Sequence, residues 1–188
     1  MEFIKLTFTI IFLLLSTVTK AADLLAEIGY HTGGDTLASG ISANNGTETL
    51  DGGDGFSIAA GYDLIMGDST ELFITLGMKK DVVYPDDGTL SFVRYPVDML
   101  LSFGSGRLKY GLGATYHLNP LYKKESLATN QTIKFKHAMG YMFDIRYIVF
   151  DRVFVSGRYT KIEYEIDGST SNSAYDGSSI GLLVGINL

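Results

Sequence analysis

Apolar and polar residues alternate along the final stretch of the chain. Ile180, Leu182, Val184, Ile186 and Leu188 lie on one side of this stretch, and the residues between them are mostly glycine or polar. A period of two is typical of a β-strand, whose successive side chains point to opposite faces. Because one face is wholly aliphatic and the other small or polar, the pattern predicts a wall between lipid and a polar interior.

The same alternation recurs upstream and predicts seven further strands. They cover residues 24–31, 56–64, 71–79, 93–103, 108–118, 133–147 and 153–166. Segments rich in Gly, Asn, Asp and Thr separate them, as expected for turns and loops. In the strand at 153–166 the apolar residues change side between Tyr159 and Ile162, which predicts a β-bulge near Lys161.

The connections between these strands alternate in length. Long polar loops are expected at 33–54, 80–89, 119–131 and 167–177, and short turns at 67–69, 104–106 and 151–152. Barrels of the bacterial outer membrane have an even number of strands, short periplasmic turns and longer outer loops. The sequence therefore predicts an all-β fold, an eight-stranded antiparallel up-and-down transmembrane β-barrel that presents four polar loops at one end.

Aromatic residues on the aliphatic side fall near the strand ends, where they would form two interfacial girdles. They are Tyr62, Phe103, Tyr110 and Tyr147 toward the short turns, and Tyr30, Tyr95 and Tyr116 toward the long loops.

A soluble barrel of the lipocalin kind, with an apolar cavity and a polar outer surface, is the alternative fold. Alternation alone does not separate the two. Glycines favour the membrane barrel, because a crowded interior needs small residues beside long ones. The charged side carries Gly29, Gly61, Gly77, Gly111, Gly113, Gly140, Gly181 and Gly185.

The N-terminal residues read as a secretory signal peptide. Residues 6–15 are almost wholly apolar and residues 16–22 are small and polar, with a cleavage site expected after Ala21. The apolar run is shorter than the roughly 20 residues of a spanning helix. We expect a signal peptide at 1–21 and one barrel domain at 22–188, located in the bacterial outer membrane.

Composition narrows the possible partners and sites. The chain has no cysteine, so it forms neither disulfides nor thiolate metal sites. Its net charge is −6 and both signs are interspersed, which argues against a nucleic-acid partner.

Charged residues on the glycine-bearing side are expected to fill the barrel interior. Buried charges persist when they are paired, so the near balance of signs predicts a lumen ion-pair network. Its members are Glu27, Asp63, Glu71, Asp98 and Asp144 with Lys79, Arg94, Lys109, Arg146 and Arg158. Symmetry about the short turns predicts that Asp144 faces Arg158 and that Arg94 faces His117. Eight strands leave room for side chains but not for a wide pore.

The predicted signal peptide, the eight strands and the alternating C-terminal strand resemble the small outer-membrane barrels of the OmpA and OmpX class. The resemblance implies folding by the outer-membrane assembly machinery, which reads the last strand, here Ile180, Leu182, Val184, Ile186 and Leu188. Members of this class usually end in Phe or Trp, whereas this chain ends in Leu188. A lipid A deacylase of the same barrel class would use a His followed two residues later by Ser, but Asn119 follows His117.

No metal or cofactor site is expected. His31 and His117 lack a patterned carboxylate for zinc. The acidic residues at 51–54 and 86–87 lack the spaced oxygen ligands of a calcium loop.

Two functions stay open on the sequence. The first is a monomeric, non-enzymatic scaffold whose four surface loops meet outer-membrane lipids, lipopolysaccharide or other surfaces. The second is a narrow gated channel, opened when the lumen ion pairs rearrange. A lipid A-modifying enzyme is the third and weakest alternative.

Overall fold

The computed structural model describes residues 21–41, 47–86, 88–126, 129–169 and 174–188. The predicted signal peptide lies outside the described residues except for Ala21, where the first strand begins. Among the described residues, no helix is long and apolar enough to cross a membrane.

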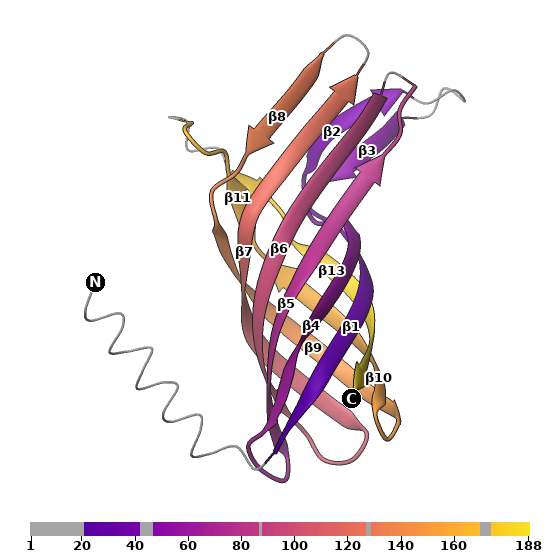
Figure 1. The fold of residues 1–188 in the computed structure, drawn as a ribbon, viewed down its shortest axis with the longest axis vertical. Helices are drawn as coiled ribbons and strands as arrows, with labels where there is room; N and C mark the ends of the chain where they lie inside the picture. Colours follow the sequence, from indigo (N-terminus) through magenta and orange to yellow (C-terminus); the bar gives the residue numbers. More distant parts are fainter. Residues whose placement is uncertain (1–20, 42–46, 87, 127–128, 170–173) are drawn as a thin grey trace, which may run out of the picture.

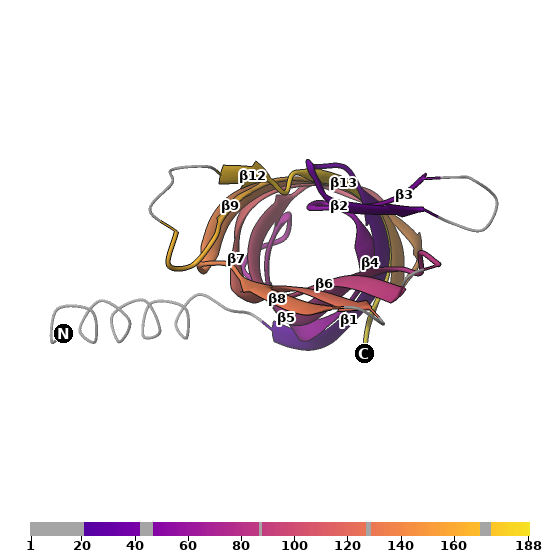
Figure 2. The same ribbon diagram turned by 90° about the horizontal axis from the view of Figure 1, so that it is seen from above.

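Eight antiparallel strands form a closed barrel, as predicted (Figures 1 and 2). They are β1 (Ala21–Thr32), β4 (Gly55–Ile65), β5 (Thr70–Val83), β6 (Gly88–Phe103), β7 (Leu108–Ser126), β9 (Ala138–Phe150), β10 (Val153–Lys161) and β13 (Ser179–Asn187). Each strand pairs with its neighbours in the order β6-β5-β4-β1-β13-β10-β9-β7, and pairing of β6 with β7 closes the wall. The main hydrogen-bonded ring therefore leaves no open edge among these strands.

The outer surface of this wall is apolar. In β13, the side chains of Ile180 and Leu182 are 65% and 68% exposed, while Leu183 between Leu182 and Val184 is buried. Tyr30, Tyr62 and many other large apolar side chains are also exposed on the outside. Exposed apolar surface on this scale is the property of a lipid-facing band.

The segments predicted to be polar loops are largely strands. Residues 33–54 contain a hairpin of β2 (Thr36–Ile41) and β3 (Thr47–Asp51), and β11 (Glu163–Glu165) pairs with β12 (Ala174–Asp176). The strands β5, β6 and β7 continue far beyond their predicted ends, and β8 (Asn130–Lys134) pairs with the extension of β7. The strand predicted at 133–147 is thus two strands, β8 and β9. Figure 1 shows these extensions rising from one end of the barrel.

The bulge predicted near Lys161 is wrong. The pairing of β10 with β9 runs without a shift from Phe154 to Lys161, and its pairing with β13 runs without a shift from Val153 to Thr160. Ile162 and Tyr164 are 2% and 0% exposed, so they continue the inward side of the strand rather than the outward side. The apolar residues change side because the interior itself becomes apolar at this height.

A bulge lies instead in β7 at Asn119, which has φ 45°. Opposite it, the register of β6 against β7 shifts between Val93 and Tyr95, whose partners are Leu121 and Leu118. Asparagine tolerates this left-handed conformation better than most residues. The bulge turns Pro120 and Tyr122 toward the inside.

At the loop end the barrel encloses a hydrophobic core. Its buried members come from almost every extended strand and loop: Leu50, Leu90, Phe92, Tyr122, Phe135, Ala138, Ile162 and Tyr164. Beyond the apolar band the outer face meets water, so apolar side chains are removed from water only inside. We call this set the loop-end core.

Candidate functional site

The turn end of the lumen is closed by a second apolar group, the turn-end plug: Leu25, Phe73, Leu100, Met142 and Phe154. Arg146 lies within it, its guanidinium 3.8 Å from the ring centre of Phe73 and 3.9 Å from that of Phe154. Cation–π contact of this kind offsets part of the cost of burying a charge. Arg146 is therefore part of an apolar seal as much as of an ion pair.

Above the plug, Arg158 is the centre of a buried ion-pair network. Its guanidinium bonds both carboxylate oxygens of Glu27 at 2.9 and 3.2 Å, and its Nε donates to Asp144 at 3.1 Å. Asp98 lies 3.5 Å away and accepts a second hydrogen bond from the Thr115 hydroxyl at 2.5 Å. The predicted contact of Asp144 with Arg158 is present, since the two residues are register partners in β9 and β10.

The remaining predicted charges are distributed among other contacts. Lys109 pairs with Glu71, and Arg146 lies 3.8 Å from Asp144. Asp63 accepts a hydrogen bond from the Asn187 amide at 2.8 Å. The predicted lumen charges therefore lie at several heights rather than in one cluster.

Arg94 and Lys79 lie higher, toward the loop end. Arg94 donates to the backbone carbonyls of Gly52 and Asp54. The prediction that Arg94 faces His117 is wrong: His117 pairs with Pro96, because the turn between β6 and β7 is centred on Gly106 and Arg107, one residue beyond the predicted centre. The ammonium of Lys79 donates to the Ser179 hydroxyl at 3.2 Å.

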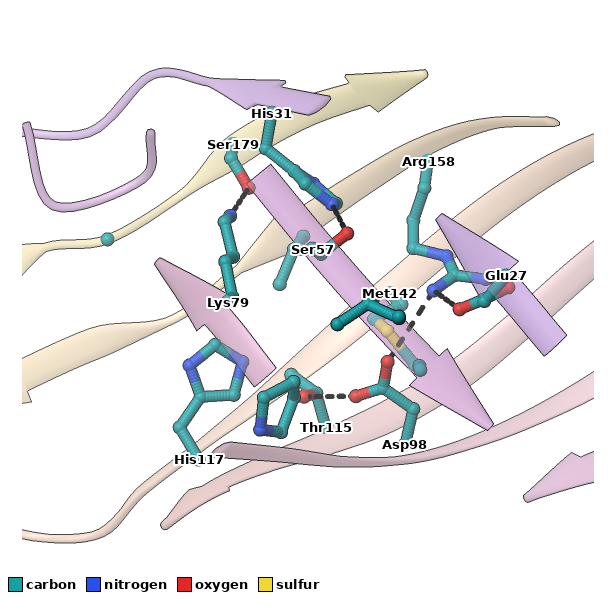
Figure 3. Close-up of a pocket in the computed structure, with 15 residues that line it drawn as sticks. Glu27, His31, Ser57, Lys79, Asp98, Thr115, His117, Met142, Arg158 and Ser179 are labelled. Atoms are coloured by element: carbon teal, nitrogen blue, oxygen red, sulfur yellow. Dashed lines mark hydrogen bonds and ion pairs between the residues drawn. The ribbon is translucent and has the colours of Figure 1, made fainter. Parts of the chain in front are cut away.

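A small cavity of about 30 Å³ lies between these layers, and we call it the central chamber. Figure 3 shows Lys79, His31 and His117 around it, with Asp98 and Arg158 on the opposite side. The His31 Nε2 atom lies 2.9 Å from the Ser57 hydroxyl. A volume of this size holds about two water molecules and no organic ligand.

Loops from three parts of the chain cover the chamber. The Gly53 amide donates to the Gly33 carbonyl at 2.9 Å, and the Asp35 amide donates to the Asp176 carbonyl at 2.7 Å. A β-carbon at Gly53 would lie 2.2 Å from the Ser178 carbonyl oxygen, so only glycine fits there. Arg94 ties this cover to the barrel from below.

Asp176 organises the rim of the cover. Ser178 donates to its carboxylate through both its amide and its hydroxyl, and Lys161 contacts it at 3.2 Å. These hydrogen bonds, above all that of the Ser178 hydroxyl, hold the pKa of Asp176 below its usual value.

His31 and His117, the two histidines of the interior, both form hydrogen bonds. The His117 Nδ1 atom lies 2.6 Å from the Tyr164 hydroxyl. Asn119, two residues after His117, donates its backbone amide to the exposed His137 at 3.2 Å. Within the described part of the chain, no group of three or more His, Asp or Glu is placed to hold a metal ion.

A groove of about 390 Å³, the bulge groove, indents the outside next to Asn119. Lys134, Lys136 and His137 line it together with Pro120, Phe135 and Asp167. Lys136 pairs with Glu165 at 2.8 Å, and this contact raises the pKa of Lys136. The alternation of apolar and polar residues did not predict this groove. The groove depends on the bulge at Asn119 and on the connection between β8 and β9.

No protein-family model matches the sequence, and no curated protein is similar to it in sequence. In structure the chain is similar to the Neisserial surface protein A, NspA, with a TM-score of 0.56 and 12% identity over 89% of this chain and 97% of that one. It is similar also to Ail, the attachment invasion locus protein of Yersinia pestis, in complex with the heparin analogue sucrose octasulfate. The TM-score to Ail is 0.56, with 10% identity over 88% of this chain and 96% of that chain. The chain thus has the fold of the eight-stranded outer-membrane β-barrels.

Proposed function

We propose that the protein is an integral outer-membrane protein whose barrel is a closed, non-conducting anchor for a folded module outside the cell. This loop-end module consists of β2, β3, β8, β11, β12 and the extensions of β5, β6 and β7. The observation that carries the proposal is that apolar layers occupy the lumen on both sides of the ion pairs. The turn-end plug closes one side and the loop-end core closes the other.

Apolar side chains across a lumen oppose ion passage because an ion would lose its hydration there. Rearranging the Arg158 ion pairs alone would leave both apolar layers in place. The narrow gated channel is therefore the weaker candidate.

Conductance of the purified protein in planar lipid bilayers tests the proposal. We expect no lasting current at neutral pH for the protein inserted in either orientation. A steady ohmic current would reject the closed anchor and favour the gated channel.

A catalytic role is not proposed for His117. Its Nδ1 is bonded to Tyr164, its side chain is buried, and no carboxylate of the described residues is hydrogen-bonded to it. Incubation with lipid A should release no acyl chains, and released fatty acid would contradict this reading.

The assembly machinery of the outer membrane is the proposed folding partner. The outward side of β13, Ile180, Leu182, Val184, Ile186 and Leu188, is aliphatic and exposed on the barrel wall. We expect the protein, as a monomer, in the outer-membrane fraction of cells. Recovery from the soluble periplasmic fraction would overturn the membrane assignment.

Lipopolysaccharide is the proposed surface partner, and the bulge groove is where its phosphates would bind. Lys134 and Lys136 offer cations beside the apolar Leu121 and Phe135, a combination that suits a phosphorylated lipid. The sulfated sugar bound to Ail is likewise polyanionic. Binding of lipopolysaccharide should weaken on Lys134→Glu and should not change on Arg107→Glu, the same charge reversal at the exposed turn end.

A further inference from the structure

The central chamber combines a buried ammonium with a second hydrogen-bond donor. Lys79 is 5% exposed, and its Nζ has one hydrogen bond among the described residues, to the Ser179 hydroxyl. An ammonium carries three donors. Two of them are left for whatever occupies the chamber.

Nearby carboxylates are occupied elsewhere. Asp98 accepts from Thr115 and contacts Arg158, Asp54 accepts from the Gly33 amide, and Asp81 accepts from the Val82 amide. In the described part of the chain, none of the three forms an ion pair with Lys79, although their charges act on it. Glu27, on the floor of the chamber, is bound by both terminal nitrogens of Arg158.

His117 offers the chamber a second polar atom. Its Nδ1 lies 2.6 Å from the Tyr164 hydroxyl. When that hydroxyl donates to Nδ1, the neutral imidazole carries its proton on Nε2. In this tautomer His117 adds an N–H donor to the chamber wall.

We propose that the central chamber is a binding site for one small inorganic anion of halide size. Lys79, His117 and the hydroxyl of Ser179 supply the donors, and the anion contacts the ammonium directly, which no carboxylate of the described residues does. A buried charge without a counter-charge in contact is unfavourable, so an anion here would stabilise the folded barrel. The chamber, which holds about two water molecules, admits a monatomic ion and has no room for a sugar.

Bromide is the probe, because its anomalous X-ray scattering identifies it. The full-length mature protein is refolded into detergent with sodium bromide and crystallised, and an anomalous peak is expected within hydrogen-bond distance of Lys79 Nζ. Its thermal unfolding midpoint should be higher in sodium bromide than in sodium gluconate at equal ionic strength, since ligands of the folded state alone raise it.

Two variants separate this site from general salt effects. Lys79→Met should remove both the peak and the difference between bromide and gluconate. Lys109→Met, a lysine that pairs with Glu71 at the turn end, should retain both. If Lys79→Met does not fold, the wild-type map alone decides. Water alone in the chamber, or bromide confined to the surface as an adventitious ion only, would overturn the proposal.

Discussion

The guanidinium of Arg146 lies 3.9 Å from the centre of the Phe154 ring, at the turn end of the lumen. Arg146 also lies 3.8 Å from Asp144, one of the partners of Arg158. Arg146 thus belongs to both the turn-end plug and the ion-pair network. A substitution that disrupts one of them should therefore also destabilise the other.

Removing the Phe154 ring should open the plug. Phe154 is 3% exposed, and a buried phenylalanine replaced by alanine costs about 3–5 kcal/mol of unfolding free energy. We expect Phe154→Ala, alone and combined with Phe73→Ala, to unfold at lower temperature in circular dichroism, while planar bilayers stay silent because the loop-end core remains. Phe150→Ala, at the 70% exposed neighbour in the same hairpin, is the control and should leave the unfolding temperature nearly unchanged. Unchanged stability of the double variant would contradict a packed plug.

Removing the Arg158 guanidinium should be among the most damaging single changes in the interior. Arg158→Met leaves Glu27, Asp98 and Asp144 without their shared cation, and breaking such a buried pair costs about 3–5 kcal/mol. Urea unfolding followed by circular dichroism measures the loss. Lys136→Met, which breaks the exposed pair with Glu165, should hardly move the transition. Equal stability of Arg158→Met and wild type would mean that the three carboxylates bind protons instead.

A charge on the outward side of β13 should block assembly. Ile186 is the register partner of Ala26 in β1 and of Val153 in β10, and its side chain faces outward. A carboxylate there must leave water for lipid, which disfavours insertion. Ile186→Asp should therefore lose the heat-modifiable folded band in gel electrophoresis of membranes, whereas Leu188→Phe should retain it. A normal folded band for Ile186→Asp would indicate that this position is not in contact with lipid.

Acid should loosen the rim of the loop-end module first. Hydrogen bonds from Ser178 hold the pKa of Asp176 below 3.8, so the folded state favours the carboxylate more than the unfolded state does. The stabilisation is complete above about pH 4 and is lost as the pH falls through the lower folded-state pKa. The protection factors of the β11 and β12 amides against hydrogen exchange should thus fall at acid pH in wild type, and Asp176→Asn should show the lower protection factors already at neutral pH. Protection independent of pH in both proteins would contradict a role for this carboxylate.

The alternating pattern determined the barrel wall. A strand that contacts lipid on one face and a packed polar lumen on the other must alternate apolar and polar side chains. Each barrel strand was therefore recognisable from its own residues. Turn symmetry was enough to pair Asp144 with Arg158, because the hairpin between them is short. The sequence of each strand alone predicted that it belongs to the barrel, which way its side chains point and which charges it places in the lumen.

Only the tertiary structure decided what happens beyond the apolar band. There the inside and outside of the barrel exchange polarity, because water replaces lipid as the outer solvent and the interior becomes the dry side. Ile162 and Tyr164 therefore looked like a change of register although the strand simply continues inward, while the true bulge at Asn119 was hidden in a polar stretch. The turn-end plug, the loop-end core and the central chamber likewise form from side chains of many strands. The alternation within a single strand does not show which side chains meet there.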